Sequence, residues 1–296
     1  MPLAVGQGNV DILRLARLVG RLGQQLQRSL LRKSHGQVLV EDRESLVPQG
    51  VLASRDPTDF GLMIRIATDP HHRHRADALG GLAAPARARY FGVASRDDLL
   101  LHRSGPQHDG YDDYGVEVTG YPAGWSVAAA RAAITTGAPV LLPLLDGSDP
   151  TTRIDASYAL ATAADPGHTV RSAFATRFAK EQDSMVRAAL VLATAETTRA
   201  HPHQPATAWI RELWQDRAQA PEVRLAAAIG WLCLTDEPAP DTLRATVEAL
   251  ASAERARAMN VLPWMAAAGG SEPGLLRCVR RMLYPEEPEP SGDPWA

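Results

Sequence analysis

A regularly spaced arginine is the feature of this 296-residue chain that most restricts its fold. The arginine ends the runs SDPTTR, DSMVR, APEVR and SAERAR, at Arg153, Arg187, Arg224 and Arg257. The intervals are 34, 37 and 33 residues, which is the length of one antiparallel helix pair with its turns. The spacing therefore predicts a row of similar helical hairpins.

Each unit has the local signals of two helices. Asp or Pro stands ahead of the repeated arginine, and both are typical of a helix start. Another amphipathic segment precedes each such helix, at 139–145, 170–179, 207–214 and 241–250. An earlier copy begins at Arg75, because RADALGGL resembles RIDASYAL at 153–160. The offset of 78 residues fits two units of about forty, the second of which contains residues 108–125.

Composition favours helices and limits the kinds of partner. Aromatic residues are only 5% of the chain and alanine is frequent, which suits close helix packing better than strands. The net charge of -3 produces no overall positive field, so nucleic acid is a disfavoured partner. No apolar run approaches the length of a membrane span, and we expect a cytoplasmic protein without membrane contact. Cys233 and Cys278 lie in apolar helical patterns and are expected to be buried free thiols.

Three segments are expected along the chain. Residues 1–55 lie outside the repeat and include a long amphipathic helix at 10–33, which we interpret as part of a helical cap for the end of the array. A dimerisation helix is the alternative. The repeat array covers 56–284, and the last residues, 285–296, are rich in Pro and acidic side chains and are predicted to be a disordered tail.

An acidic and aromatic segment, HDGYDDYGVEVTGYPAGW at 108–125, interrupts the repeat. We predict a short loop or hairpin insertion near 104–124, and such insertions often form the rim of a binding surface. A structured connection without function is the alternative. The acids lack the alternation and the glycine of an EF-hand loop, so calcium binding is not predicted. The candidate binding residues are Asp109, Tyr111, Asp112, Asp113, Tyr114, Glu117, Tyr121 and Trp125.

The repeated positions form a second candidate surface. Its members are Arg153, Asp155, Arg187, Arg224, Arg257 and Trp214. A row of arginines binds anions, or it hydrogen-bonds the turns and acids of adjacent units, and we favour the second role because an acid lies beside most of them. Trp231 occupies the slot that Leu160 fills in another unit, so we predict it in the core. Trp209 and Trp214 do not share one stripe of their helix, and the pattern allows one of them to be exposed.

The chain has no signature of a metal, cofactor or catalytic site. The histidines of DPHHRH and HPHQP lack the spacing of metal ligands, and the common nucleotide-binding and hydrolase motifs are missing. Neither a metal nor a cofactor is therefore expected, and the balance favours a protein that is not an enzyme.

Units such as LLDGSDPTTRIDASYALA and APEVRLAAAIGWL resemble HEAT repeats, in particular the short bacterial kind also found in phycobilin lyases. The resemblance implies an all-α, right-handed α-solenoid of about five to six hairpins with a concave binding face, and hence a scaffold for a protein or peptide. One alternative is an enzyme similar to the HEAT-like DNA glycosylases, with Trp209, Trp214, Asp216 and Arg217 as its local grouping. The negative net charge departs from that family's need for phosphate contacts. The other alternative is a lyase-like chaperone for a small-molecule intermediate.

Overall fold

The computed structural model describes residues 57–88, 127–235 and 237–252, together with the single residues Arg255, Met259 and Leu283. Several predictions lie outside these residues. They concern the cap at 1–55, the insertion near 104–124 with all its candidate side chains up to Trp125, the tail at 285–296, Arg257 and Cys278.

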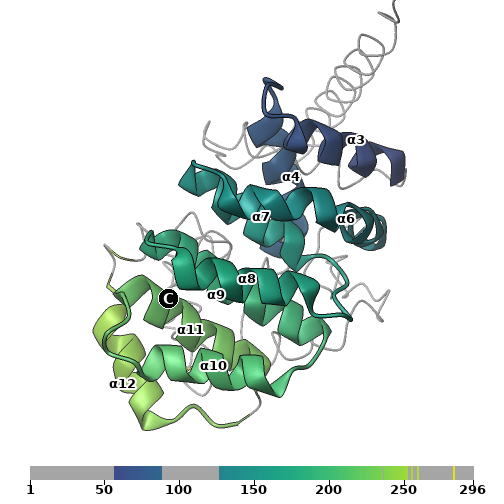
Figure 1. The fold of residues 1–296 in the computed structure, drawn as a ribbon. Helices are drawn as coiled ribbons and strands as arrows, with labels where there is room; N and C mark the ends of the chain where they lie inside the picture. The colour runs from purple at the N-terminus through teal and green to yellow at the C-terminus, as the bar shows by residue number, and fades with distance from the viewer. Residues whose placement is uncertain are drawn as a thin grey trace, which may run out of the picture.

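Every regular element in the described residues is helical, which confirms the all-α prediction for this part of the chain. The elements are α3 (Pro57–Thr68), α4 (Arg75–Ala88), α6 (Val127–Leu141), the short 3-10 helix η3 (Leu142–Asp146), α7 (Pro150–Ala161), α8 (Thr169–Lys180), α9 (Ser184–Ala200), α10 (Gln204–Gln215), α11 (Pro221–Leu234) and α12 (Asp241–Leu250). Figure 1 shows them following one another from one end of the molecule to the other.

The helices that carry the repeated arginine begin where the sequence predicts. Asp149 caps α7, because its carboxylate accepts the backbone N–H of Thr152 at 2.8 Å. Asp183 caps α9 in the same way, with its Oδ1 2.8 Å from the backbone nitrogen of Met185. Pro221 occupies the first turn of α11, where the missing N–H costs no hydrogen bond. Side-chain capping therefore fixes the start of α7 and α9, and a proline in the first turn marks the start of α11.

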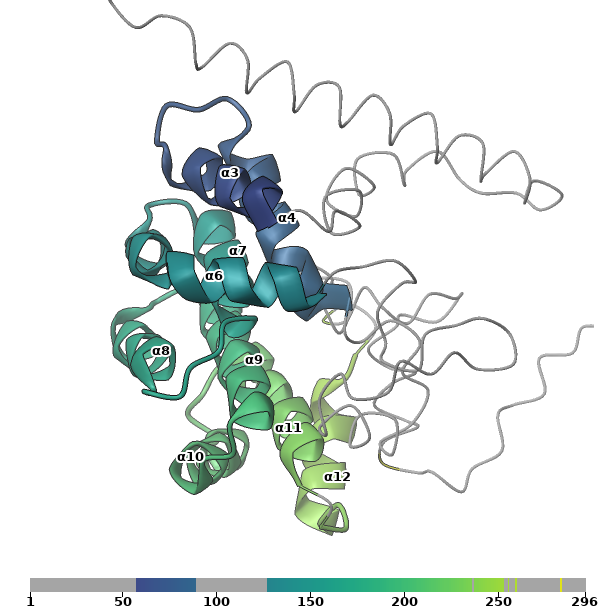
Figure 2. The ribbon, with the colours of Figure 1, turned by 90° about the vertical axis from the view of Figure 1, so that its right-hand side faces the viewer.

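The helices pack in two layers. The inner layer consists of α4, α7, α9 and α11, each packed on the next, and α3, α6, α8, α10 and α12 pack against it. Figure 2 shows α8 and α10 on one side of α9 and α11. Each successive pair of helices, from α6 and α7 to α10 and α11, therefore adds one outer and one inner helix to the stack.

One predicted feature of the repeat is wrong. The 78-residue offset between Arg75 and Arg153 suggested a further unit between their helices. In the structure α4 packs directly against α7, and α3 packs against α6. The segment between α4 and α6 therefore separates two neighbouring hairpins of the stack, and its length was misread as an additional repeat.

Three inner helices are buried around their whole circumference. All residues from 153 to 161 in α7, from 188 to 199 in α9 and from 225 to 234 in α11 are buried. Runs of this length cover every face of a helix, since one turn takes 3.6 residues. These three helices are therefore the core of the described stack, and their buried stretches present no open helix face.

Small residues allow these helices to approach closely. A Cβ placed on Gly230 of α11 would lie 3.2 Å from the Cβ of Ala195 on α9. A Cβ on Gly137 of α6 would lie only 2.7 Å from the Cδ1 of Ile64 on α3. The alanine-rich composition thus corresponds to tight helix contacts, as predicted.

The core also tests the predictions for individual side chains. Trp231 is fully buried, which confirms its assignment to the leucine slot. Trp214 is 2% exposed, whereas Trp209 is half-buried and meets Phe178 edge to face at 5.1 Å between ring centroids. Cys233 is a buried free thiol, as expected.

Candidate binding surfaces

The repeated arginines bind the ends of neighbouring elements. Arg75 donates from Nε to the carbonyl of Ala67 at 3.1 Å, which ties the start of α4 to the last turn of α3. Arg224 makes the equivalent bond to the carbonyl of Trp214 at 3.2 Å, between α11 and α10. Arg187 donates to Oε1 of Gln219 at 2.8 Å, in the turn of the next hairpin. Arg187 thus reaches the turn of an adjacent unit, which is the role that we favoured for the arginine row, whereas Arg75 and Arg224 bond within their own hairpins.

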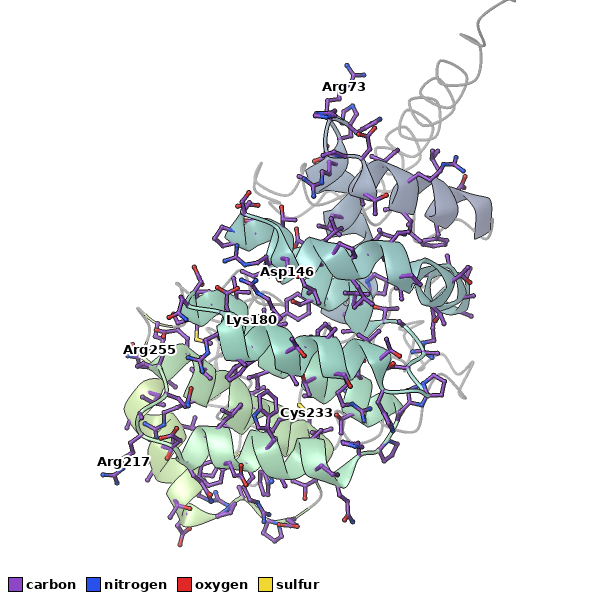
Figure 3. The ribbon with its side chains drawn as sticks, viewed as in Figure 1. Arg73, Asp146, Lys180, Arg217, Cys233 and Arg255 are labelled. Atoms are coloured by element: carbon purple, nitrogen blue, oxygen red, sulfur yellow. The ribbon has the colours of Figure 1, made fainter. Side chains whose placement is uncertain are left out.

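The turns inside the hairpins, residues 146–149, 181–183 and 216–220, follow one another along one side of the stack, which we call the turn edge. Figure 3 shows Lys180, Arg217 and Arg255 on this side. Arg177 of α8 donates to Oδ1 of Asp146 at 2.9 Å and to Oε2 of Glu181 at 2.6 Å. It therefore joins the turn at 146–149 to the turn at 181–183.

A buried carboxylate is the centre of the turn edge. Glu181 is 4% exposed and accepts hydrogen bonds from Nε of Arg153 at 2.8 Å and from a terminal nitrogen of Arg177 at 2.6 Å. It also accepts the backbone N–H groups of Gln182 and Asp183, both at 3.0 Å. Burial alone would raise the pKa of this carboxyl, but the N–H of Asp183 and the two guanidiniums outweigh it and lower the pKa to about 2.

Arg153 completes this network from α7. Arg153 is 7% exposed as a whole residue. Its guanidinium donates to the carbonyls of Gly147 and Ser148 at 2.9 and 3.0 Å. Both charges of the Arg153–Glu181 pair are therefore fully hydrogen-bonded, as a buried ion pair requires. The pair links two hairpins, and it leaves Arg153 with little surface for a ligand.

The grouping that the glycosylase alternative needs is not assembled. Trp214 lies in the core at 2% exposure, whereas Asp216 is exposed in the turn after α10. The side chain of Gln219 and the N–H of Ala218 donate to this carboxylate and lower the pKa of Asp216. Such a carboxylate is a turn acceptor and differs from the recessed base of an active site.

Asp155, the remaining member of the repeat-face candidates, is buried on α7 at 8% exposure. A Cβ on Gly80 of α4 would lie 3.8 Å from its Oδ2, so the carboxylate faces the neighbouring inner helix. Within the described ranges, the candidate residues Arg153, Asp155 and Trp214 are thus interior side chains rather than parts of one exposed face.

The opposite side of the stack holds a different network. The connections between hairpins, residues 162–168, 201–203 and 235–240, form what we call the connection edge. Asp165 is 3% exposed and caps α8 by accepting the N–H groups of Val170 and Arg171 at 3.1 and 3.0 Å. Arg171, 6% exposed, reaches from α8 to the carbonyl of His201 at 3.0 Å. The end of α9 is thereby fixed to the start of α8.

Two histidines meet beside this arginine. A terminal nitrogen of Arg171 lies 3.0 Å from Nδ1 of His168, and the rings of His168 and His203 are 4.9 Å apart between centroids. His203 caps α10, because its Nδ1 accepts the backbone N–H of Ala206 at 3.2 Å. Burial, followed by the charges of Arg171 and His168, lowers the pKa of His203.

The first described turn holds a second histidine pair, in which Nδ1 of His72 accepts the backbone N–H of His74 at 3.1 Å and the ring centroids are 5.9 Å apart. The N–H of His71 donates to Asp69 at 2.9 Å, and His74 pairs with Asp77 at 3.1 Å. In the described part of the chain, no three His, Cys, Asp or Glu side chains converge as metal ligands.

A third surface is the outer side of α6 and η3. Its exposed positions up to Pro143 are Ala128, Ala132, Thr136, Pro139, Val140 and Pro143, and the exposed Asp146 follows at the end of η3. The spacing of the residues from Ala128 to Pro143 places them in one row along the helix, which we call the α6 row. Val140 is 53% exposed and is the one large apolar side chain that is exposed among the described residues. Every member of the row is uncharged.

The same segment is unusual in length and composition. Ala128–Asp146 is long and apolar enough to cross a membrane by those criteria alone, and 28% of it is buried in the structure. The exposed positions of α12 are different, since they include Asp241 and Glu248, and those of α10 include Arg211 and Glu212. The uncharged row is therefore a property of α6 and is not shared by these two outer helices.

The sequence predicted some of these contacts and surfaces and missed others. The Arg153 role was predicted from the repeat, whereas the contact between His168 and His203 was missed because it joins two connections that are far apart in the chain. The periodicity of apolar residues at 128–143 was a signal for the α6 row, but periodicity does not reveal which face remains open. No protein-family model, curated protein or solved structure matches this chain.

Proposed function

We propose that this chain is a HEAT-like, right-handed α-solenoid that acts as a binding scaffold for a protein or peptide. Two findings support the architecture: successive hairpins pack in sequence along two layers, and the arginine at the start of the inner helices bonds to the preceding helix or turn in three of them. A stack of this kind extends by repetition and offers long surfaces for recognition.

The binding surface that we propose is the α6 row. A concave groove lined by the inner helices is disfavoured, because α7, α9 and α11 are buried on all sides. The α6 row is instead accessible, and the single observation that supports it most is the 53% exposure of Val140 in a row without charge. Contiguous exposed apolar surface is uncommon on soluble monomers and marks interaction sites.

The chemistry of the row limits its partner. Ala128, Ala132 and Thr136 have short side chains, so a partner can approach the helix backbone closely. The row itself has no charge to pair with a phosphate or a basic peptide, and the exposed Asp146 at the end of η3 is paired with Arg177. The proposed partner is therefore an apolar segment of a protein, bound mainly through the removal of apolar surface from water.

Photo-crosslinking in the native host tests this proposal. A photoreactive amino acid at position 140 should give a defined crosslinked protein, and the same residue at position 212, on the charged outer side of α10, should not give that product. Position 212 is a matched control because Glu212 is also exposed on an outer helix. Crosslinking of position 140 only to lipid would contradict a protein partner, and equal products at both positions would contradict the assignment to α6.

A further inference from the structure

We propose that the connection edge contains a binding site for an oxyanion group, a phosphate or a carboxylate, formed by His168, Arg171 and His203. The site lies away from the α6 row and does not depend on the scaffold function. It rests on the hydrogen-bonding pattern of the two imidazoles, on the buried arginine between them and on the close approach of their rings.

The proton positions of both rings follow from their partners. A guanidinium only donates, so Nδ1 of His168, 3.0 Å from Arg171, is an acceptor. The backbone N–H of Ala206 also only donates, so Nδ1 of His203 is an acceptor as well. A neutral imidazole with an unprotonated Nδ1 carries its proton on Nε2. Each ring therefore has one N–H group left for a ligand.

The two rings are close enough to act together. Their centroids are 4.9 Å apart and their planes are tilted by 49°. His168 is exposed and His203 is partly exposed, so solvent and small ions reach the pair. An oxyanion has several acceptor oxygens and is able to receive hydrogen bonds from two neighbouring N–H groups at once.

The surrounding charge favours an anion over a metal ion. Arg171 is 6% exposed, and its Nε has no hydrogen-bond acceptor in the described part of the chain. Its positive charge lies beside both rings and opposes a cation there, although the nearby carboxylate of Asp165 offsets part of this charge. The Nδ1 lone pairs that a metal would use are already occupied. Asp165 is held by the backbone N–H groups of Val170 and Arg171, so it is engaged as a helix cap.

The φ angle of His168 is 57°, and it is the one non-glycine residue with positive φ in the described ranges. Histidine is among the residues that adopt this left-handed conformation more readily than most side chains do.

Nuclear magnetic resonance of the imidazole nitrogens in the full chain measures such binding directly. Sodium phosphate and, separately, sodium acetate are titrated at pH 7 with sodium chloride as the control at equal ionic strength. We expect saturable shifts of His168 and His203 with one common dissociation constant, while His71 serves as the internal reference. The anion with the lower dissociation constant shows whether the site prefers a phosphate or a carboxylate.

Two substitutions preserve the local backbone and remove the imidazole N–H donors, since the shorter Asn amide places its NH2 group elsewhere. His203→Asn keeps an efficient N-cap for α10, and His168→Asn tolerates the left-handed conformation. Each should weaken anion binding about tenfold or more, since one hydrogen bond to a charged group is lost, and circular dichroism should show intact helices. Shifts that do not saturate, shifts of all histidines alike, unchanged affinity in both variants, or a response to zinc but not to either anion would overturn the proposal.

Discussion

The two edges of the stack fix the same helix, α8, by opposite arrangements of charge. At the turn edge a carboxylate, Glu181, is enclosed by two guanidiniums. At the connection edge a guanidinium, that of Arg171, is enclosed by an imidazole nitrogen and backbone carbonyls. The first arrangement is an ion-pair network, whereas in the second Arg171 donates to an imidazole and to carbonyls, and the buried carboxylate of Asp165 acts on it through its charge without a direct ion pair.

Because of this difference, the two edges should lose stability in different pH ranges. A carboxylate with a pKa near 2 keeps its charge throughout the neutral and mildly acidic range. Burial and the charges of Arg171 and His168 lower the pKa of His203 from its ordinary value of 6.5, so the neutral ring that caps α10 becomes charged only as the pH falls below that value. We therefore expect the turn edge to be a permanent joint between hairpins and the connection edge to be responsive to pH and ligands.

The largest effect is expected for Glu181→Gln. The change leaves the guanidinium of Arg153 buried without a compensating charge and should lower the free energy of unfolding by about 3 kcal/mol. Urea denaturation followed by circular dichroism measures the difference. Glu237→Gln is the matched control, because Glu237 pairs with Arg211 at 2.7 Å at an exposed position, with a side chain that is 63% exposed. Its effect should be below about 1 kcal/mol, and equal losses in both variants would show that burial of the turn edge is unimportant.

Acid should act on the turn edge only well below neutral pH. The pKa of Glu181 falls from 4.5 to about 2 on folding, so its contribution is complete above pH 4.5 and is lost as the pH falls towards 2. The shift corresponds to about 3 kcal/mol. The stability of Glu181→Gln should therefore decrease less than that of the wild type between these pH values. Parallel decreases would indicate that another carboxylate determines acid unfolding.

A smaller loss of folding stability is expected for Asp165→Ala at the connection edge. The substitution removes the acceptor of two N–H groups at the start of α8, and loss of an N-cap typically costs about 1 kcal/mol. Thermal melts at pH 7.5 provide the measurement. A loss as large as that of Glu181→Gln would mean that the two edges contribute equally.

The smallest expected effect is a change in the pH dependence of folding stability in the variant His203→Asn. The pKa of His203 is lowered on folding, so its contribution is present above pH 6.5 and declines as the pH falls below that value. Asn caps α10 without titrating, and the variant should lose less stability than the wild type between pH 7.5 and 5.5. An unchanged pH profile would exclude His203 as the titrating group.

Local rules predicted much of the fold. Asp149 and Asp183 were read as helix caps because short carboxylates satisfy free N–H groups, and the repeated register placed Trp231 in the core. The direct packing of α4 on α7 was not predicted, since residue spacing along the chain does not distinguish an insertion from a repeat. The α6 row could not be predicted from the sequence, because the exposure of Val140 depends on which side of α6 is left uncovered by the neighbouring helices.

The affinity of the crosslinked partner for Val140→Glu, compared with Ala245→Glu, tests the central claim most directly. Both positions are exposed on outer helices, and both variants introduce the same charge. We expect both proteins to fold as stably as the wild type. The partner should bind Val140→Glu at least about tenfold more weakly, because the new carboxylate must lose its hydration on binding, and it should bind Ala245→Glu with unchanged affinity. Unchanged binding to Val140→Glu would contradict the assignment of the binding surface to the α6 row.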